Sequence, residues 1–266
     1  MAAREGAKAA RERYDQVSRS PAVKEALEKV QIDHTPVDLI VVDEINRQPL
    51  GRPWLSLVID IASRMVCGFF LSMIPPSSIS VALALAHCVA RKDLWLADRE
   101  LSFEWPVSGL QDLVYMDNAK EFHAEALRSA AQEWGIDLDF RPRGLPHFGG
   151  HIERLIGTMM GAVHPIPGTT FSNIAERGNY PSMKKAVMTL PELERWFALQ
   201  VHVYHSTIRS NLNVTPLTAW KRAVAARGAP IRQMTDADQR NFFLDLLPSQ
   251  RRKIRRDSIR LFNIHY

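Results

Sequence analysis

Three acidic residues stand in sequence contexts that could bring them together for metal-dependent chemistry. Asp33 lies in the run QIDHT, Asp117 in YMDNAKEF, and Glu153 follows a glycine pair in GGHIERLIGT. Carboxylate oxygens are ligands that Mg²⁺ and Mn²⁺ prefer. Two such ions can activate an attacking hydroxyl and stabilise the leaving oxygen at a phosphodiester. The trio therefore predicts a centre for phosphodiester chemistry. The expected cofactor is Mg²⁺ or Mn²⁺, with two ions bound.

Other acids near the same stretch compete with Asp33 for this role. Asp38 and Asp43 follow it closely, and Asp60 lies in VIDIASR. We expect Asp43 to face water at a hairpin, and Asp60 could hydrogen-bond within a sheet. We favour Asp33 because its context fits best with the other two acids.

Each remaining member of the trio also has an ordinary structural explanation. Asp117 could form an Asx turn or cap a helix, and Glu153 could sit in a first helical turn because the helix dipole favours it there. A second pattern, His202 and His205 spaced by three on a predicted helix, could bind a metal. We interpret the two histidines as packed residues, since apolar and aromatic residues surround them.

The elements that must position these acids can be predicted from periodicity and turn signals. Short apolar runs rich in β-branched residues predict three sequential strands, and then helices alternate with two further strands. A mixed sheet with helices on its faces follows from this order. The expected strands cover residues 30–44, 54–63, 64–74, 112–117 and 136–140, with a turn at 46–53; the expected helices cover 78–91, 123–134 and a segment starting near 151.

The flanking segments differ in character from this central part. Residues 3–30 are rich in Ala, Glu, Lys and Arg and predict a helical arm. Residues 165–182 show no periodicity, and two helices are expected at 191–206 and 216–226. From residue 228 a loop is expected to lead into a strand-like end. We therefore divide the chain into a helical linker arm (1–29), a catalytic core (30–227), and a linker with a truncated β segment (228–266).

Composition favours a polyanionic partner and a reducing compartment. The 266 residues carry a formal net charge of +5, and between Arg251 and Arg260 five arginines and one lysine face the single acid Asp257. Only Cys67 and Cys88 occur, outside any CxxC pattern, so disulfide scaffolding is not expected. No apolar run approaches the ~20 residues of a membrane span, and the first thirty residues do not resemble a secretory signal. We expect a cytoplasmic protein without a membrane partner.

Several blocks together resemble a known family. QIDHT, RPWLSLVIDIASRMVCGF, YMDNAKEF, GGHIERLIGT and YHSTIRSNLNVTPLTAW occur in order across roughly residues 30–226. They resemble the catalytic cores of DDE transposases of the TnsB, TniA and Mu type, in the retroviral integrase superfamily. The resemblance implies an RNase H-like fold followed by the start of a small β-barrel domain. It also assigns the catalytic and metal-ligand role to Asp33, Asp117 and Glu153.

The same resemblance implies an activity and partners. The expected reaction is metal-dependent cleavage of transposon-end DNA and strand transfer into target DNA. A nuclease that only hydrolyses, or a catalytically idle DNA-binding or assembly module, stays open as an alternative. Implied partners are transposon-end and target DNA, further copies of the chain on paired DNA ends, and an AAA+ ATPase regulator, in the bacterial cytoplasm at the nucleoid. No helix-turn-helix array precedes the core, so recognition of specific ends by this chain alone is not expected.

A set of mostly basic residues near the acids and in the tail could contact DNA. Those beside the acids or on the glycine-containing loop would meet an approaching DNA end, and those in the tail would bind phosphates. The candidates are Asn118, Lys120, Arg141, Arg143, His147, His151, Arg154, Arg251, Arg252, Lys253 and Arg255. Two further arginines, Arg52 and Arg64, could be either structural or functional.

Overall fold

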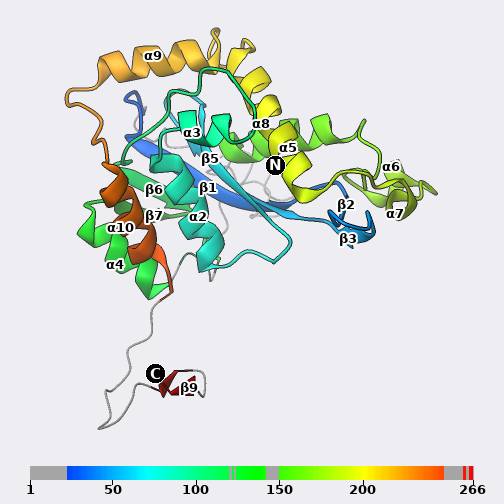
Figure 1. Ribbon diagram of the computed structural model, residues 1–266. Coiled ribbons are helices and arrows are strands. Elements are labelled where there is room, and N and C mark those ends of the chain that lie inside the picture. The colour runs from blue at the N-terminus through cyan, green and yellow to red at the C-terminus, as the bar shows by residue number, and fades with distance from the viewer. Residues whose placement is uncertain are drawn as a thin grey trace, which may run out of the picture.

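A five-stranded mixed sheet forms the centre of the molecule (Figure 1). The computed structural model describes residues 23–119, 122, 124–141, 150–248, 260–261 and 264–265. The strand order in the sheet is β5-β4-β1-β6-β7. These strands are β1 (Lys29–Pro36), β4 (Trp54–Asp60), β5 (Val66–Ser72), β6 (Leu113–Met116) and β7 (Asp137–Phe140).

The strand directions follow the lengths of the connections. β1, β4 and β5 pair antiparallel, whereas β6 runs parallel to β1 and β7 runs parallel to β6. Parallel neighbours need a crossover, and helices supply it before β6 and β7. Three antiparallel strands in chain order, extended on the β1 side by two parallel strands, form an RNase H-like α/β fold. The predicted fold class is confirmed.

Strand β4 shows that both faces of the sheet are covered. Alternate side chains of a strand point to opposite faces. In β4, Leu55, Leu57 and Ile59 are fully buried, and so are their neighbours of the other parity, such as Val58. The continuous hydrophobic run LVI in the sequence reflects this two-sided burial.

Helices α2 (Ser78–Val89), α4 (Glu125–Glu133) and α10 (Asp236–Leu246) lie together beside the sheet (Figure 1). α2 packs on β5 and β4, and α10 contacts both α2 and α4. Gly68 in β5 permits the close approach of α2, because an added Cβ would lie 2.6 Å from the backbone nitrogen of Cys88.

Helix α10 corrects the expectation of a loop after residue 228. Thr235 and Asp238 form a capping box at its start. Phe242 and Leu246, one helical turn apart, are buried in the main core. These two are the buried residues of the helix, so its buried stripe is narrow and the helix depends on the surface that receives it.

The remaining helices build the part of the fold that carries the third acid. α5 (Gly150–Val163) packs against β1 and β4, and α8 (Leu190–Ser206) packs on β5 and α9 (Pro216–Ala226). Thr189 and Thr215 accept hydrogen bonds at the starts of α8 and α9, where a proline follows in the first turn. The two helices predicted at 191–206 and 216–226 are confirmed. Short elements not predicted from the sequence are α3 (Asp93–Ala97), α6 (Ile174–Arg177) and α7 (Ser182–Lys185). The single strand expected over residues 30–44 is instead divided, because β1 ends at Pro36 and β2 (Val41–Val42) pairs with β3 (Pro49–Gly51) in a hairpin.

The expected helix over residues 3–30 is wrong at its described end, where residues 23–28 form a turn. Leu27 adopts a positive φ of 59° and is fully buried. Its backbone N–H donates to Asp60, and the N–H of Ala26 donates to the carbonyl of Ala223 in α9. These tertiary contacts override the helical propensity of this stretch. Residues 1–22 lie outside the described residues.

At the other end, β8 (Arg260–Leu261) and β9 (Ile264–His265) pair antiparallel in a short hairpin. The assignment of residues 228–266 to the start of a β-barrel stays a prediction. In the described part of the chain, no helix has both the length and the apolarity to cross a bilayer.

Candidate active site

The pairing of β1 with β6 brings Asp33 and Asp117 side by side. Gln31 is the parallel partner of Tyr115. Asp33 and Asp117 each lie two residues further along, so they follow the same pair on neighbouring strands, which are ~4.8 Å apart. Asp33 lies within β1, and Asp117 directly follows the last residue of β6.

Glu153 reaches this place from α5. It stands in the first turn of the helix, and α5 contacts β1 and β4. Its side chain is 48% exposed, whereas that of Asp33 is 18% exposed. The trio thus combines a recessed carboxylate on the sheet with a more accessible one on a helix.

Arg141 links two of the acids. Its guanidinium lies 3.0 Å from Oε1 of Glu153 and 3.7 Å from Oδ2 of Asp33. Its backbone N–H donates to the carbonyl of Met116, the last residue of β6, and Asn118 donates from its amide to the carbonyl of Arg141. The end of β7 is therefore fastened beside Asp117, and the Arg141 side chain is aimed at the acids.

The electrostatics of Asp33 show that the three acids share one environment. Burial, together with the nearby charges of Asp117 and Glu153, raises the pKa of Asp33 to about 6, against the lowering effect of the His34 N–H and of Arg141. Like charges act on each other in this way only within a short range. Ionised together, the three acids require a cation, and Arg141 supplies part of that charge.

The chemistry of this donor set fits a divalent cation. Three carboxylates offer hard oxygen ligands, and their mutual repulsion falls when a cation binds between them. Within the ranges that the structure describes, no three carboxylate, imidazole or thiol groups stand close enough together to hold a metal ion as they are. Arg141 contacts two of the acids instead, so the acids would have to close around an ion as this arginine withdraws.

His34, which the sequence did not single out, packs next to Asp33. Its ring stacks on Phe122 at 5.0 Å between centroids, and its Nδ1 lies 2.7 Å from Oγ of Ser56. Nε2 is buried without a hydrogen-bond partner. Burial lowers the pKa of His34 to about 4, although Asp117 acts in the opposite direction. The only sequence signal was its position beside Asp33.

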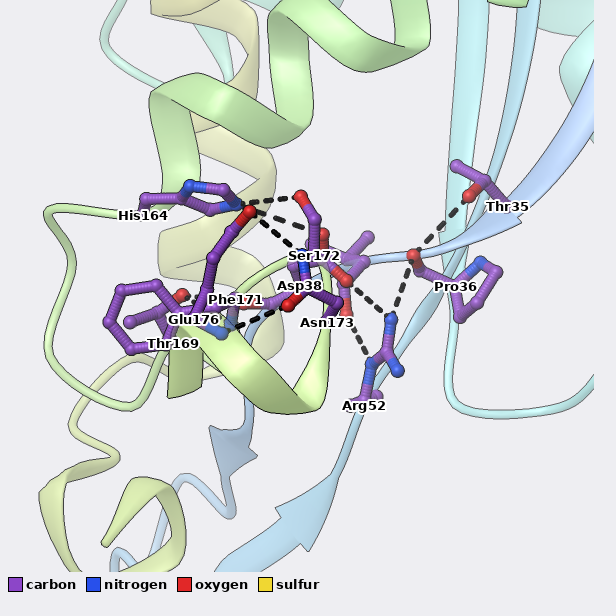
Figure 2. A network of polar contacts seen from close by, with 11 residues as sticks. Thr35, Pro36, Asp38, Arg52, His164, Thr169, Phe171, Ser172, Asn173 and Glu176 are labelled. Atoms are coloured by element: carbon purple, nitrogen blue, oxygen red, sulfur yellow. Dashed lines mark hydrogen bonds and ion pairs between the residues drawn. The ribbon is translucent and has the colours of Figure 1, made fainter. Parts of the chain in front are cut away.

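A polar network holds the far end of α5 (Figure 2). Asp38, in the segment after β1, accepts from Arg52 at 2.6 Å and lies 3.9 Å from Nε2 of His164, which follows α5. Its backbone carbonyl accepts from the hydroxyl of Thr169 and from the N–H of Thr170. This network joins the chain after β1 to the chain after α5, and so fixes the helix that carries the third acid.

The rival acids have structural partners. Asp38 belongs to that network, and Asp43 accepts from three backbone N–H groups of its exposed hairpin. Asp60 is fully buried and accepts from the backbone N–H groups of Leu27 and Ser63. Arg52, bound to Asp38 and to backbone carbonyls, is structural as well.

The histidine pair on α8 is packed, as interpreted. His205 is fully buried, and its Nε2 accepts the backbone N–H of Val66 at 2.9 Å. His202 stacks on Phe103 with 4.5 Å between ring centroids. The interpretation of both residues as packed side chains is confirmed.

The expected DNA-contacting residues divide into two groups. The first group lies at or beside the acids. It includes Asn118 and Arg141, whose contacts are described above. It also includes His151 and Arg154, which line a small pocket on α5. The rest fall outside the described residues, namely Lys120, Arg143, His147, Arg251, Arg252, Lys253 and Arg255.

A family model described as the TnsB C-terminal domain matches residues 31–168, which include all three acids. The match covers more than half of the chain. The chain belongs to the TnsB C-terminal domain family.

Curated relatives of this TnsB-family chain include two transposition proteins. The transposase for transposon Tn552 of Staphylococcus aureus is 26% identical over 242 residues, which are 89% of this chain and 45% of the relative. The transposition protein TnsB of transposon Tn7 of Escherichia coli is 29% identical over 130 residues, which are 46% of this chain and 18% of the relative. The chain thus spans less than half the length of either relative.

Solved structures with a similar arrangement come from retroviral integration. One is a chain of the simian T-cell lymphotropic virus intasome in complex with PP2A regulatory subunit B56 gamma, with a TM-score of 0.49 at 14% identity over 82% of this chain and 61% of that chain. Another is the HTLV-2 integrase catalytic core domain in complex with magnesium, with a TM-score of 0.43 at 10% identity over 75% of this chain and 99% of that chain.

Proposed function

We propose that this chain carries the catalytic centre of a DDE transposase that cleaves transposon-end DNA and transfers the new 3′ end into target DNA. The observation that supports this most is that Asp117 and Glu153, far from Asp33 in the sequence, both lie close enough to act on its carboxylate, within a TnsB-family fold. Family membership makes DNA transposition the leading process. The acids give the chemical means.

In this proposal Asp33 and Asp117 hold divalent cations from the sheet, and Glu153 completes the site from α5. Two Mg²⁺ or Mn²⁺ ions, when bound, would supply an activated attacking oxygen and a stabilised leaving oxygen. The protein's own contribution is positioning. The sheet fixes two carboxylates, the Asp38 network fixes the helix that carries the third, and Arg141 balances their charge before the ions arrive.

The substrates in this proposal are transposon-end and target DNA, bound mainly through phosphates. Copies of the chain would assemble on paired ends, and an AAA+ ATPase would regulate target choice. The Tn552 and Tn7 relatives, both described as transposition proteins, support the process. Such a protein would work at the bacterial nucleoid.

Single substitutions of the acids test the proposal. Asp117→Asn and Glu153→Gln should each lower DNA joining at least ~100-fold, since each removes one of the few ligands of the catalytic ions. Asp43→Asn serves as the matched control, because Asp43 is an exposed acid that only caps its own hairpin. Circular dichroism checks that every variant is folded.

The products separate the proposal from its alternatives. Joined molecules are expected only from a transferase, while a nuclease would release cut ends alone. An idle DNA-binding module would show no Mg²⁺-dependent reaction at all. Full joining by the Asp117→Asn or Glu153→Gln variant would refute the assignment of these acids.

A further inference from the structure

A small pocket on the flank of α5 gathers three arginines from distant parts of the chain. It has a volume of about 60 Å³ and is lined, among others, by Arg64, Arg154 and Arg209. Arg64 comes from the turn between β4 and β5, Arg154 from the first turns of α5, and Arg209 from the loop after α8. The volume is several times the ~10–15 Å³ that one water molecule needs.

The guanidinium groups in this pocket lack acidic partners. Among the described residues, no carboxylate lies within ion-pair distance of any of the three arginines. Nε of Arg64 and Nε of Arg209 are buried without a hydrogen-bond partner. The nearest acid in its effect on Arg64 is Asp60, whose oxygens are occupied by backbone N–H groups. A buried N–H group without an acceptor lowers the stability of the folded protein. An anion that accepts hydrogen bonds from these arginines would therefore stabilise the protein.

Aromatic and polar neighbours hold the arginines in place. The guanidinium carbon of Arg209 lies 4.1 Å from the centroid of the Tyr204 ring, a cation–π contact. Arg64 donates to the backbone carbonyl of Ile61. Both groups are therefore oriented before any ligand binds, and little further ordering is needed to receive an anion.

The local electrostatic field agrees with this geometry. His151 lines the same pocket as the three arginines. Burial, with the charge of Arg154, lowers the pKa of Arg64. The three guanidinium groups therefore make the pocket positive.

We propose that this pocket binds one phosphate of the DNA backbone, separate from the phosphate that reacts. Guanidinium groups match phosphate oxygens in geometry and charge. Arg154 follows Glu153 directly, so its side chain leaves α5 about 100° around the helix axis from the acid. A phosphate held there would set the register of the DNA beside the metal site. This inference rests on the proposed function, since it takes DNA as the ligand.

Arg209→Gln is the most informative variant. It removes a pocket charge and the unpartnered Nε, while the hydrogen bonds that hold this loop use only the backbone of Arg209. Arg222→Gln is the matched control, since it removes the same charge from an exposed position on α9. Arg209→Lys keeps the charge but loses the planar donor set.

The assay measures binding of the full chain to a fluorescein-labelled DNA duplex of mixed sequence, with Ca²⁺ in place of Mg²⁺, between ~50 and ~200 mM salt. Arg209→Gln should weaken binding about tenfold, and its slope of log affinity against log salt should be shallower by about 0.9. Arg222→Gln should change neither value appreciably, and Arg209→Lys should fall between.

Equal effects of Arg209→Gln and Arg222→Gln on DNA binding, or no effect of either, would overturn the inference about the pocket. The proposed function would still stand in that case if the wild-type chain binds and joins DNA. A folded wild-type chain that binds no DNA would overturn both. Inorganic phosphate is the second probe. If it raises the melting temperature of the wild type but not of Arg209→Gln, and Arg209→Gln still binds DNA normally, the pocket takes a free phosphate and the DNA assignment is wrong.

Discussion

Arg141 offers a direct way to test how the three acids handle charge. Its guanidinium pairs with Glu153 at 3.0 Å and with Asp33 at 3.7 Å, and it is 14% exposed. A cation that binds between the acids must take its place. We therefore expect Arg141→Ala to bind divalent metal more tightly than the wild type in the absence of DNA.

The magnitude follows from the two contacts. Because Glu153 is half exposed, its pair with Arg141 contributes only ~0.2–1 kcal/mol. The contact with the more buried Asp33 is worth more, on the order of 1–2 kcal/mol once the desolvation of both groups offsets the direct attraction. In the wild type, a metal ion can bind between the acids only after both Arg141 contacts are broken. The Arg141→Ala variant has no such contacts to break, so its metal-binding free energy should be more favourable by their sum. The two contacts together are worth at least ~1.2 kcal/mol, so the expected gain is about tenfold or more in affinity, where tenfold corresponds to ~1.4 kcal/mol.

The measurement is a titration with Mn²⁺ in which electron paramagnetic resonance reports the free ion. It should be made near pH 8, because Arg141 is one of the influences that lower the pKa of Asp33, and without it that pKa rises above about 6. Arg91→Ala is the control, since Arg91 pairs with Asp93 on the exposed surface. Unchanged or weaker Mn²⁺ binding by a folded Arg141→Ala protein would refute the idea that Arg141 competes with the metal.

Three further predictions concern stability, each measured by urea unfolding. Burial lowers the pKa of His205 to about 3, so below pH ~6.5 only the unfolded chain takes up a proton at this residue. The free energy of unfolding therefore keeps the full contribution of His205 above pH ~6.5 and falls by ~1.4 kcal/mol per pH unit below it. In His205→Gln this pH dependence of the free energy of unfolding should be shallower by ~1.4 kcal/mol per pH unit. An unchanged slope contradicts this. Lys92→Met should cost ~2–4 kcal/mol, because its buried ammonium donates to two backbone carbonyls at the end of α2 and to that of Val107, between α3 and β6. A similar change at exposed Arg91 should cost under ~1 kcal/mol, and equal costs would contradict the prediction. Gly68→Ala should cost ~1–3 kcal/mol or more, since its Cβ would collide with the backbone of α2, and a neutral result would mean that α2 is free to shift.

Much of the sheet and the two acids on it could be predicted from local pattern. The runs around Asp33 and Asp117 are apolar, short and bounded by turn residues, so both strands were located. Their adjacency follows from the parallel pairing of β1 with β6, whereas the element order predicted only a mixed sheet. The start of α5 was predicted near His151, one residue after its first residue.

Features that depend on tertiary contacts were not predictable in the same way. Arg141 was expected to meet DNA, yet its side chain turns to two acids, a choice set by local charge rather than by neighbouring sequence. The pocket joins Arg64 to Arg209 across a long stretch of sequence, and no periodic pattern links them. Helix α10 has a sequence signal in its capping box, but its buried stripe consists of few residues, so the sequence pattern favours a loop there.

The most direct test of the central claim is anomalous diffraction from crystals of an active preparation soaked in Mn²⁺. We predict one or two manganese peaks between the carboxylates of Asp33, Asp117 and Glu153, with the Arg141 guanidinium withdrawn from Glu153. Manganese bound only elsewhere, or an acid cluster still closed on Arg141 in protein that joins DNA under the same conditions, would contradict the account.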